Sequence, residues 1–238
     1  MRAETLRIGI VGTSGRLGSR LVAACADRGV PVVLTATRTT WEDVPGTPPT
    51  VVIDASRGAV LPLTAAYCQR AGAALIACAS DLDSEGIDAA RALSAQVPVV
   101  QATNLSIGHW LQNRLTRSAA SIMRRLPDPP VASVLERHTA AKRDRPSASA
   151  RALAATWETA SGEGEVTEVV SYRAGLAVSE HTLDLTFPCE TVSLRHDVRD
   201  LGAAVFGALA AADWAHDAPV GFYLINALFD RLLVEESP

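Results

Sequence analysis

The sequence predicts an α/β protein in which a doubly wound parallel sheet is followed by a second, α+β part with a mainly antiparallel sheet. Two observations support this prediction. Up to position 106, short apolar runs alternate with amphipathic stretches of about ten residues, as in βαβ units. Beyond position 131 the apolar runs are longer and follow one another, as antiparallel strands do. We therefore expect a first domain at 1–106, a second at 107–214, and a return of 215–238 to the first.

The composition is that of a globular protein with a substantial core. The 238 residues are 48% hydrophobic and 20% charged, which is enough to bury a core without cross-links. The net charge is -4, and no basic run is interleaved with aromatic residues, so we expect no nucleic acid partner. No apolar stretch approaches the ~18 residues of a membrane span and no secretion signal begins the chain. We expect a cytoplasmic protein that makes no membrane contact.

The cysteines predict neither a metal site nor a disulfide framework. Cys25, Cys68, Cys78 and Cys189 are widely dispersed and lack the CxxC spacing that is typical of zinc sites. We expect small buried thiols in a reducing compartment, and no bound metal.

The first half alternates strands with helices. Apolar runs predict strands at 6–11, 31–36, 50–54, 73–77 and 97–101, and helical periodicity predicts helices at 19–26, 61–71 and 84–95. In a doubly wound sheet the ligand lies outside the carboxyl ends of the strands. We therefore expect those five ends to line a single crevice.

A glycine-rich turn follows the first strand and opens the first helix. Gly12 permits a tight turn, Gly15 lets backbone N–H groups approach a pyrophosphate, and Gly18 allows the helix to pack on the strand. The N-terminus of the helix also favours an anion. The turn therefore predicts a Rossmann-type dinucleotide site in the first domain, with these cofactor contacts: Gly12, Thr13, Ser14, Gly15, Arg16, Leu17 and Gly18.

The second predicted strand ends at Thr37 and Arg38. An acidic residue is usual at this point when the cofactor is NADH, whereas an arginine accommodates the 2′-phosphate of NADPH. We therefore expect NADPH, with NADH as the alternative, and Arg38 as a phosphate ligand. Asp54 is expected either to close its strand or to touch the ribose. The ends of the later strands supply the other expected cofactor contacts: Ser56, Cys78, Ala79, Ser80, Ala102, Asn104 and Ser106.

The second half has a different rhythm. A helix is expected from 109 to about 125, where prolines end it, and another at 149–157 over one face of a sheet. Strands are expected at 131–136, 165–174, 181–187 and 191–196, and a last helix at 200–214 leads back toward the first domain. Burial of the uncovered sheet face against other copies predicts a homo-oligomer, either a dimer or a tetramer. We expect His109 at the surface and His181 and His196 as hydrogen-bonded structural residues.

The most densely charged stretch is the connection from 136 to 150, between a predicted strand and a predicted helix. A charged surface loop is solvated by default, and its neighbours decide whether it is also a functional site. His138 and Lys142 are four residues apart in it. They meet if the segment is helical, and they share a face if it is extended, because the spacing is even.

Four blocks of the sequence, taken in order, carry a family resemblance. They are the glycine turn at 11–18, the segment 102–108, the stretch 136–150, and the region from Arg173-Ala-Gly175 through Glu180-His181-Thr182 to Glu190 and His196. The third block is similar to the pattern E-x-H-H-x-x-K-x-D-A-P-S-G-T-A. Together they resemble the dihydrodipicolinate reductases, also called 4-hydroxy-tetrahydrodipicolinate reductases, of lysine biosynthesis. The resemblance covers nearly the whole chain.

The resemblance implies hydride transfer from a nicotinamide to a small molecule, an unsaturated cyclic imine dicarboxylate. It implies that His138 and Lys142 are catalytic and that 107–214 is the substrate-binding and oligomerisation domain. The implied substrate contacts are Thr139, Arg145, Ser147, Ala148 and Ser149. The chemistry agrees, because hydride addition builds electron density that must be protonated, and a nearby cation both binds carboxylate and delivers a proton.

The sequence departs from the family pattern at contact positions. Thr139 replaces a second histidine, Arg145 replaces an alanine, and Ala148-Ser149 replaces Gly-Thr. Ser149 keeps a hydroxyl at an expected helix N-cap, whereas Ala148 adds a Cβ where glycine lets the substrate approach the backbone. The Gly-Thr-Thr-Gly turn that is usual after the fourth strand is here Ala77-Cys78-Ala79-Ser80.

We interpret the chain as a diverged member that reduces a related cyclic imine or enamine carboxylic acid in specialised biosynthesis. The alternatives are the lysine-pathway reductase itself and a non-catalytic NADPH sensor. The retained His138 and Lys142 argue against a sensor, whereas Thr139 and Ala148 favour one. A short-chain reductase is disfavoured, because no tyrosine is followed by lysine at the Tyr-x-x-x-Lys spacing.

Overall fold

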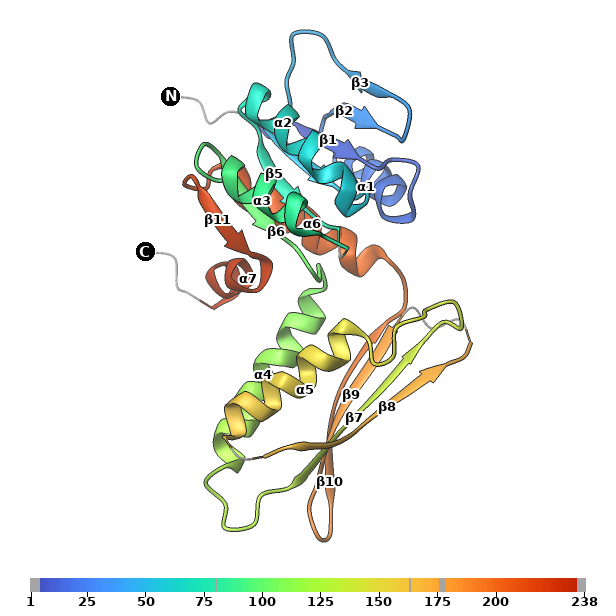
Figure 1. Ribbon diagram of the computed structural model, residues 1–238, viewed down its shortest axis with the longest axis vertical. Helices are drawn as coiled ribbons and strands as arrows, with labels where there is room; N and C mark the ends of the chain where they lie inside the picture. Colours follow the sequence, from blue (N-terminus) through green and yellow to red (C-terminus); the bar gives the residue numbers. More distant parts are fainter. Residues whose placement is uncertain (1–4, 80, 163, 176–178, 235–238) are drawn as a thin grey trace. The chain divides into compact units, whose positions relative to one another are not determined.

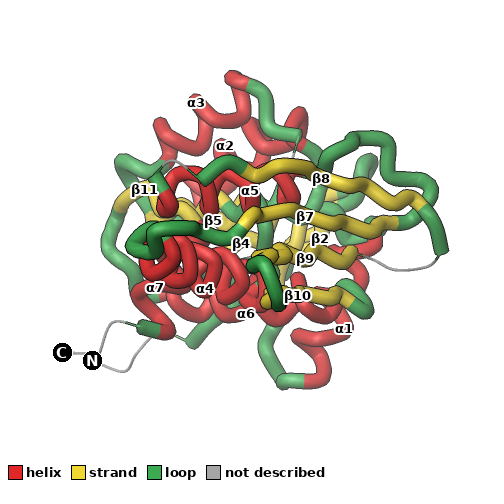
Figure 2. The backbone as a smooth tube through the Cα atoms, turned by 90° about the horizontal axis from the view of Figure 1, so that it is seen from below, coloured by secondary structure: helices red, strands yellow, loops and turns green. Residues whose placement is uncertain are grey.

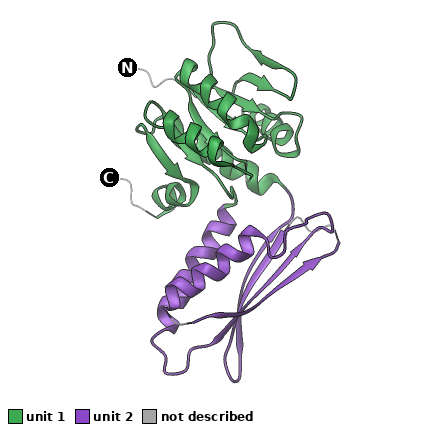
Figure 3. Ribbon diagram, in the orientation of Figure 1, with its two compact units in different colours: residues 1–106, 201–238 green, residues 107–200 purple. Residues whose placement is uncertain are grey.

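The computed structural model describes residues 5–79, 81–162, 164–175 and 179–234. The chain forms two compact units: unit 1 contains Met1–Ser106 and Leu201–Pro238, and unit 2 contains Ile107–Asp200 (Figure 3). The return to unit 1 begins at Leu201 and not at 215 as expected. The helix expected at 200–214 therefore belongs to unit 1.

Unit 1 is an open α/β sheet (Figure 1). Up to residue 106 its elements are β1 (Ile8–Val11), α1 (Arg16–Asp27), β2 (Val32–Ala36), β3 (Trp41–Asp43), β4 (Val51–Asp54), a 3₁₀ turn η1 (Gly58–Val60), α2 (Leu61–Ala71), β5 (Ala74–Ala77), α3 (Ser84–Leu93) and β6 (Pro98–Gln101). After unit 2 the chain adds α6 (Gly202–His216), β11 (Gly221–Leu224) and α7 (Ile225–Leu233).

The sheet of unit 1 has the strand order β11-β6-β5-β4-β1-β2-β3. Its neighbouring strands are parallel except for β2 and β3, which form an antiparallel pair at one edge. The chain moves from β1 to β2 on one side and then crosses to β4 on the other, so the topological switch point lies between β1 and β4. Doubly wound sheets hold their ligands at this point. The predicted fold class is confirmed.

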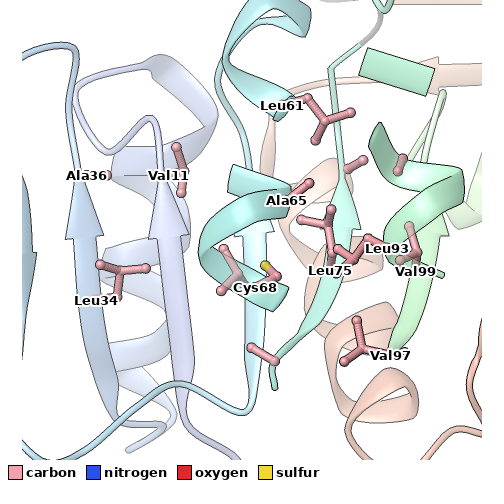
Figure 4. Close-up of a cluster of buried hydrophobic side chains, with 14 residues drawn as sticks. Val11, Leu34, Ala36, Leu61, Ala65, Cys68, Leu75, Leu93, Val97 and Val99 are labelled. Carbon is pink, nitrogen blue, oxygen red and sulfur yellow. The ribbon is translucent and has the colours of Figure 1, made fainter. Parts of the chain in front are cut away.

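The central strands are apolar because both of their faces are covered. β1, β4 and β5 are buried along their whole length, as strands inside a parallel sheet must be. On one face, α2 presents Leu61, Ala65 and Cys68 at helical spacing to strand side chains such as Leu75 (Figure 4). Burial of one such leucine side chain stabilises the fold by roughly 2 kcal/mol.

Helix α6 explains why the chain returns to unit 1 early. The helix is rich in alanine, and its small side chains let it pack closely on β4, β5 and β6 next to α1. A Cβ on Gly207 would lie 1.8 Å from the carbonyl oxygen of Leu105. The backbone of α6 therefore touches the segment that follows β6.

Unit 2 is a two-layer α+β fold. Its elements are α4 (Ile107–Met123), β7 (Val131–His138), α5 (Ala148–Ser161), β8 (Val166–Arg173), β9 (Ser179–Thr186) and β10 (Thr191–Val198). The strands lie side by side in the order β10-β9-β7-β8 (Figure 2). Only β7 and β8 are parallel in this described sheet, which confirms the mainly antiparallel prediction. The helices α4 and α5 pack together, and their core with the sheet includes Leu153, Trp157 and Leu183.

Several local expectations differ from the structure. β7 runs to His138, so the charged connection begins at Thr139 and not at position 136. β3 and β11 were not predicted, because each is a short edge strand without enough residues to show alternation. Cys189 is exposed, not buried as expected.

Within the described residues, none of the helices combines the length and apolar character needed to cross a bilayer.

Candidate functional site

The glycine turn at the end of β1 requires glycine at two positions. Gly12 has φ +89°, and a Cβ there would lie 2.8 Å from the carbonyl oxygen of Ala55. A Cβ on Gly18 would lie 2.1 Å from the carbonyl oxygen of Gly12. No L side chain fits either position without a shift of the backbone. Helix α1 begins directly after Gly15, so its first N–H groups are available to an anion at the switch point.

The residues around this turn divide into buried and exposed groups. Ser14, Gly15 and Arg16 are exposed, and Leu17 is half-buried. Thr13 faces the protein, because its amide and hydroxyl both donate to the carbonyl oxygen of Ala36, at 3.0 and 3.1 Å. The turn therefore offers backbone N–H groups and one exposed guanidinium, which suit a phosphate.

Arg38 lies in a compact turn after β2. Oγ1 of Thr37 accepts the amides of Thr39 and Thr40, at 3.3 and 3.2 Å, and closes this turn. The side chain of Arg38 is exposed. The structure therefore presents a cation beside the end of β2, where the sequence predicts a 2′-phosphate.

Asp54 ends β4 as a buried hydrogen-bond acceptor. Its carboxylate accepts the amide of Ser56 at 2.9 Å, the hydroxyl of Ser56, and the hydroxyl of Thr64 at 2.6 Å. Burial raises the pKa of Asp54, and these hydrogen bonds oppose the rise. Of the two expected roles, the structure shows the one in which Asp54 closes its strand. The hydroxyl of Ser56 donates to Asp54 and so has a partner within the protein.

The ends of β5 and β6 carry the remaining expected cofactor residues. The amide of Cys78 donates to the carbonyl oxygen of Asp54, and that of Ala102 donates to Ala77, both at 2.9 Å. Ala79 is buried, and burial raises the pKa of the Cys78 thiol. Oδ1 of Asn104 accepts the amide of Ser106 at 3.0 Å and shapes that loop. Ser80 lies outside the described residues.

In unit 2, a buried carboxylate organises the charged segment. Glu136 is fully buried on the helix-covered face of β7. Its Oε1 accepts the hydroxyl of Ser171 and Nη2 of Arg173, both at 2.6 Å, and the amide of Ser147 at 3.0 Å. Burial alone would raise the pKa of Glu136, but these hydrogen bonds outweigh it and lower the pKa to about 2. Glu136 is therefore ionised at neutral pH.

The other oxygen of the same carboxylate faces histidines. Oε2 of Glu136 lies 3.1 Å from Nε2 of His138 and 3.7 Å from Nε2 of His181. His138 is buried, so a side chain expected in a solvated loop instead sits at the inner end of β7. Strand β7 therefore places His138 next to the ionised carboxylate of Glu136.

His181 belongs to a wider group of histidines on α4, β9 and β10, in which His109 and His181 are buried and His196 is half-buried. The ring centroid of His109 lies 6.0 Å from that of His181 and 6.1 Å from that of His196. Burial lowers the pKa of His109 to about 4 and that of His181 to about 3, and neighbouring histidines add to both shifts. His109 is therefore not at the surface as expected, because α4 packs this side of its first turn against the sheet.

Lys142 does not contact the buried carboxylate directly. Its Nζ lies 2.9 Å from Oδ1 of Asp144, and its side chain is 33% exposed. Arg173 donates to the carbonyl oxygen of Lys142 from Nε at 3.2 Å and to that of Asp144 from Nη2 at 2.5 Å. One guanidinium therefore joins the Lys142 loop to Glu136. Lys142 is also the only lysine in the chain, since all other members of its 22 Lys and Arg residues are arginine.

The N-cap of α5 is Ser147, and Ser149 lies within the first turn, contrary to the expected cap. Oγ of Ser147 accepts the amide of Ala150 at 3.1 Å. Both serines satisfy the residue preference for a cap, but only the amide of Ser147 is also held by Glu136. Ser147 is buried, so its hydroxyl supports the loop from inside.

The other substituted positions lie nearer to solvent. Arg145 and Ala148 are exposed, and Thr139 and Ser149 are half-buried. The sequence departures from the family pattern therefore fall on the outer side of the loop. In the network beneath it, Glu136, His138 and Ser147 match the family pattern.

Sequence reasoning gave no site role to Glu136, Ser171 or Arg173. One signal was available in the strand pattern: Glu136 falls at even spacing from Ala132 and Val134, so alternation places it on the buried face. A charged residue at such a position needs a partner. The pattern cannot say that the partner is Arg173, which lies on another strand.

Glu136, His138 and His181 also lie close enough together to suggest a metal site. Such ligands suit zinc. The guanidinium of Arg173 already neutralises Glu136, so a divalent ion would bring uncompensated charge into a buried position. The arrangement is better described as a hydrogen-bonded network.

Comparisons with known proteins agree with this architecture. Residues 6–105 match the family described as dihydrodipicolinate reductase, N-terminus, and residues 108–229 match dihydrodipicolinate reductase, C-terminus. The 4-hydroxy-tetrahydrodipicolinate reductase of Gluconobacter oxydans is 33% identical over 94% of this chain and 97% of its own. That of Xanthomonas euvesicatoria is 30% identical over 96% and 99%.

A solved structure shows the same fold. The dipicolinate-bound dihydrodipicolinate reductase from Paenisporosarcina sp. TG-14 superposes with a TM-score of 0.73, covering 93% of this chain and 98% of its own, at 14% identity. The matches run through both units, and the predicted family resemblance is confirmed. The chain therefore belongs to the dihydrodipicolinate reductase family of NAD(P)H-dependent oxidoreductases.

Proposed function

We propose that this protein uses NADPH to reduce a cyclic imine or enamine carboxylic acid, as a diverged member that acts in specialised biosynthesis. One observation carries the proposal. His138 and the Lys142 loop are held by a satisfied, buried Glu136–Arg173 network, while the outer contact positions differ from the family pattern. The retention of His138 and Lys142 above this network supports catalysis over a cofactor sensor.

The roles of the residues follow from the chemistry. The nicotinamide, when bound, supplies the hydride. The N–H groups at the start of α1 bind its pyrophosphate. The ammonium of Lys142 pairs with a substrate carboxylate, and His138 or Lys142 gives the proton that the reduced ring requires.

The substituted positions indicate where the substrate differs. Thr139 removes an imidazole, and with it a donor for an anionic group. Ala148 adds a Cβ at the exposed start of α5, where a carboxylate would approach the backbone amides. Arg145 adds a cation to the exposed part of the loop. These changes support a related substrate with a different arrangement of acidic groups.

The lysine-pathway reduction is the second candidate. Two relatives that carry that name, those of Gluconobacter oxydans and Xanthomonas euvesicatoria, are aligned over nearly their whole length at 33% and 30% identity. The test is consumption of NADPH with 4-hydroxy-tetrahydrodipicolinate beside cyclic imines that carry one carboxylate. We expect turnover of a cyclic imine acid. Stoichiometric NADPH binding without any turnover across the series would contradict catalysis and favour a sensor.

Arg38 supports NADPH as the cofactor, because a guanidinium in the turn after β2 pairs with a 2′-phosphate that NADH lacks. We expect Arg38→Ala to weaken NADPH binding by about tenfold or more and to leave NADH binding nearly unchanged. Calorimetric titration with each cofactor measures both affinities.

The matched control is Arg91→Ala, an exposed arginine in the last turn of α3, which lies at the opposite, amino-terminal edge of the strands. It should leave both affinities unchanged. Equal affinity of the wild-type protein for NADPH and NADH would remove the role given to Arg38.

We also propose a homo-oligomer, a dimer or a tetramer, formed through the sheet of unit 2. On the face of β7 and β8 away from α4 and α5, Val131 is 57% exposed and Tyr172 is 49% exposed. Apolar and aromatic side chains on an open sheet face suit burial against another copy. Light scattering measures the mass, and a monomer at micromolar concentration would contradict this proposal.

A further inference from the structure

We propose that Glu136 is a positioning residue for the reaction: its buried carboxylate sets the protonated nitrogen and the orientation of His138, and through Arg173 it also fixes the loop that carries Lys142. The inference rests on the proposed function and adds to it. One carboxylate would then hold both proposed catalytic groups in place, although His138 ends β7 and Lys142 lies in the loop that follows.

Glu136 and His138 are in direct hydrogen-bonding contact. Their side-chain exposed fractions are 0% and 8%, and Oε2 lies 3.1 Å from Nε2. An ionised carboxylate has no hydrogen to donate, so the hydrogen of this contact must belong to Nε2 of His138. With that hydrogen held, the proton that His138 gains and loses is the one on Nδ1. The adjacent negative charge also favours the imidazolium form.

The side chain of Arg173 is 1% exposed. Its guanidinium presents several N–H donors in a planar fork. Nη2 reaches Oε1 of Glu136 at 2.6 Å, and the same group donates to the carbonyl oxygens of Lys142 and Asp144. Without Glu136 this buried cation would lack its carboxylate partner. The position of the loop backbone at Lys142 therefore depends on Glu136 through Arg173.

The two carboxylate oxygens of Glu136 have different partners. Ser171 and Arg173 occupy Oε1, and Oε2 is directed to the histidines. The amide of Ser147 bridges both oxygens, at 3.0 and 3.2 Å, and fixes the start of α5. One carboxylate thus joins β7, β8, the Lys142 loop and α5. A neutral amide of the same shape cannot accept from all of these donors, because one of its two ends is itself a donor.

Glu180 provides a matched control on the neighbouring strand. It is a buried glutamate of β9 that pairs with Arg195 at 3.1 Å and lies 4.0 Å from Arg137. Glu180→Gln therefore removes the same charge from the same sheet without altering the partner of His138.

The experiment compares wild type, Glu136→Gln and Glu180→Gln as full-length proteins with NADPH bound. Nitrogen-15 NMR of the histidines is expected to show hydrogen on Nε2 of His138 in the wild type. In Glu136→Gln the pKa of His138 is expected to fall by at least about one unit, and the matching limb of the kcat profile to move equally toward lower pH. We expect kcat to fall by about 10²-fold while the Kd for NADPH is unchanged. Glu180→Gln should change none of these quantities.

Two results would overturn the proposal: the Nδ1–H tautomer in the wild type, or an unchanged pKa of His138 in Glu136→Gln. If Glu136→Gln does not fold, Glu136→Asp replaces it, because the charge is retained with a shorter reach. That variant should keep the pKa of His138 near the wild-type value while kcat falls, and a large pKa shift there would equally contradict the proposal. The tautomer and pKa need no substrate, so failure of the proposed reaction is recognised separately.

Discussion

Replacing Lys142 with alanine is expected to lower kcat by about 10²-fold or more while NADPH binds as tightly as before. Lys142 lies in the loop of unit 2, whereas the turn expected to bind the pyrophosphate lies in unit 1. Loss of the ammonium therefore removes a charge near the substrate without touching the cofactor contacts. Steady-state kinetics with the preferred imine acid and cofactor titration measure the two effects independently.

Lys142→Arg separates charge from proton transfer. An arginine keeps the positive charge and the pairing with Asp144, but it does not give up its proton at any accessible pH. If Lys142 only binds carboxylate, the arginine variant should retain most of the activity. If it delivers the proton, kcat should fall nearly as far as in Lys142→Ala. An unchanged rate in the alanine variant would contradict both roles.

Acidification from pH 7 to pH 4 is expected to lower the free energy of unfolding by an amount on the order of 6 kcal/mol, with roughly half from each of two buried histidines. The folded-state pKa of His109 is lowered from 6.5 to about 4, and that of His181 from 6.5 to about 3. Between pH 6.5 and these values the unfolded chain binds protons that the folded chain does not. Stability therefore rises with pH across this window and is lost as the pH falls.

The acid effect continues below pH 4.5 because of Glu136. Its folded-state pKa is lowered from 4.5 to about 2, so the stability that it contributes is present above 4.5 and is lost as the pH falls toward 2. The groups that face His181 include Glu136, His138 and His196, and Asp197 lies beside His196. Between pH 6.5 and pH 4.5 the loss of stability therefore comes from the histidines, and below about pH 3 it comes from Glu136.

Urea unfolding at a series of pH values measures this dependence, and two variants assign it. His109→Gln should reduce the slope between pH 6 and pH 4 by up to about 1.4 kcal/mol per pH unit, the value for one proton. His216→Gln is the control, because His216 ends α6 in unit 1, outside the histidine cluster. Equal slopes in wild type and His109→Gln would remove the role given to the buried imidazole.

The fold was predictable wherever one element shows its own periodicity. β1, β4 and β5 are apolar runs that predict buried strands. The glycine turn after β1 indicates the position of the switch point from sequence alone. The return of α6 to unit 1 was harder to place, because a helix that is apolar on all sides does not show which sheet it covers. The edge strand β11 depends on β6, a pairing partner far away in sequence, and β3 is too short to show a strand pattern of its own although it pairs with the neighbouring β2.

The choice of His138 and Lys142 as catalytic residues stays a prediction, and the residues that support them were not predictable. The resemblance named His138 and Lys142, yet local charge density suggested a loop where β7 continues to His138. The choice of Ser147 over Ser149 as the cap depends on Glu136, eleven residues earlier. Likewise, Arg173 lies 37 residues from the carboxylate that it neutralises. Such partners are set by strand pairing in three dimensions, and residue preference alone cannot choose among them.

The most direct test of the proposed function is the ratio of kcat/KM for 4-hydroxy-tetrahydrodipicolinate to kcat/KM for cyclic imines that carry a different set of acidic groups, with NADPH as the cofactor. The wild-type protein should prefer one of the latter. The triple substitution Thr139→His, Ala148→Gly and Ser149→Thr, which restores three of the four departures from the family pattern at the loop, should move the ratio toward the lysine-pathway compound. A wild-type protein that already turns over the lysine-pathway compound best, and whose ratio the triple substitution leaves unchanged, would contradict the divergence that we propose.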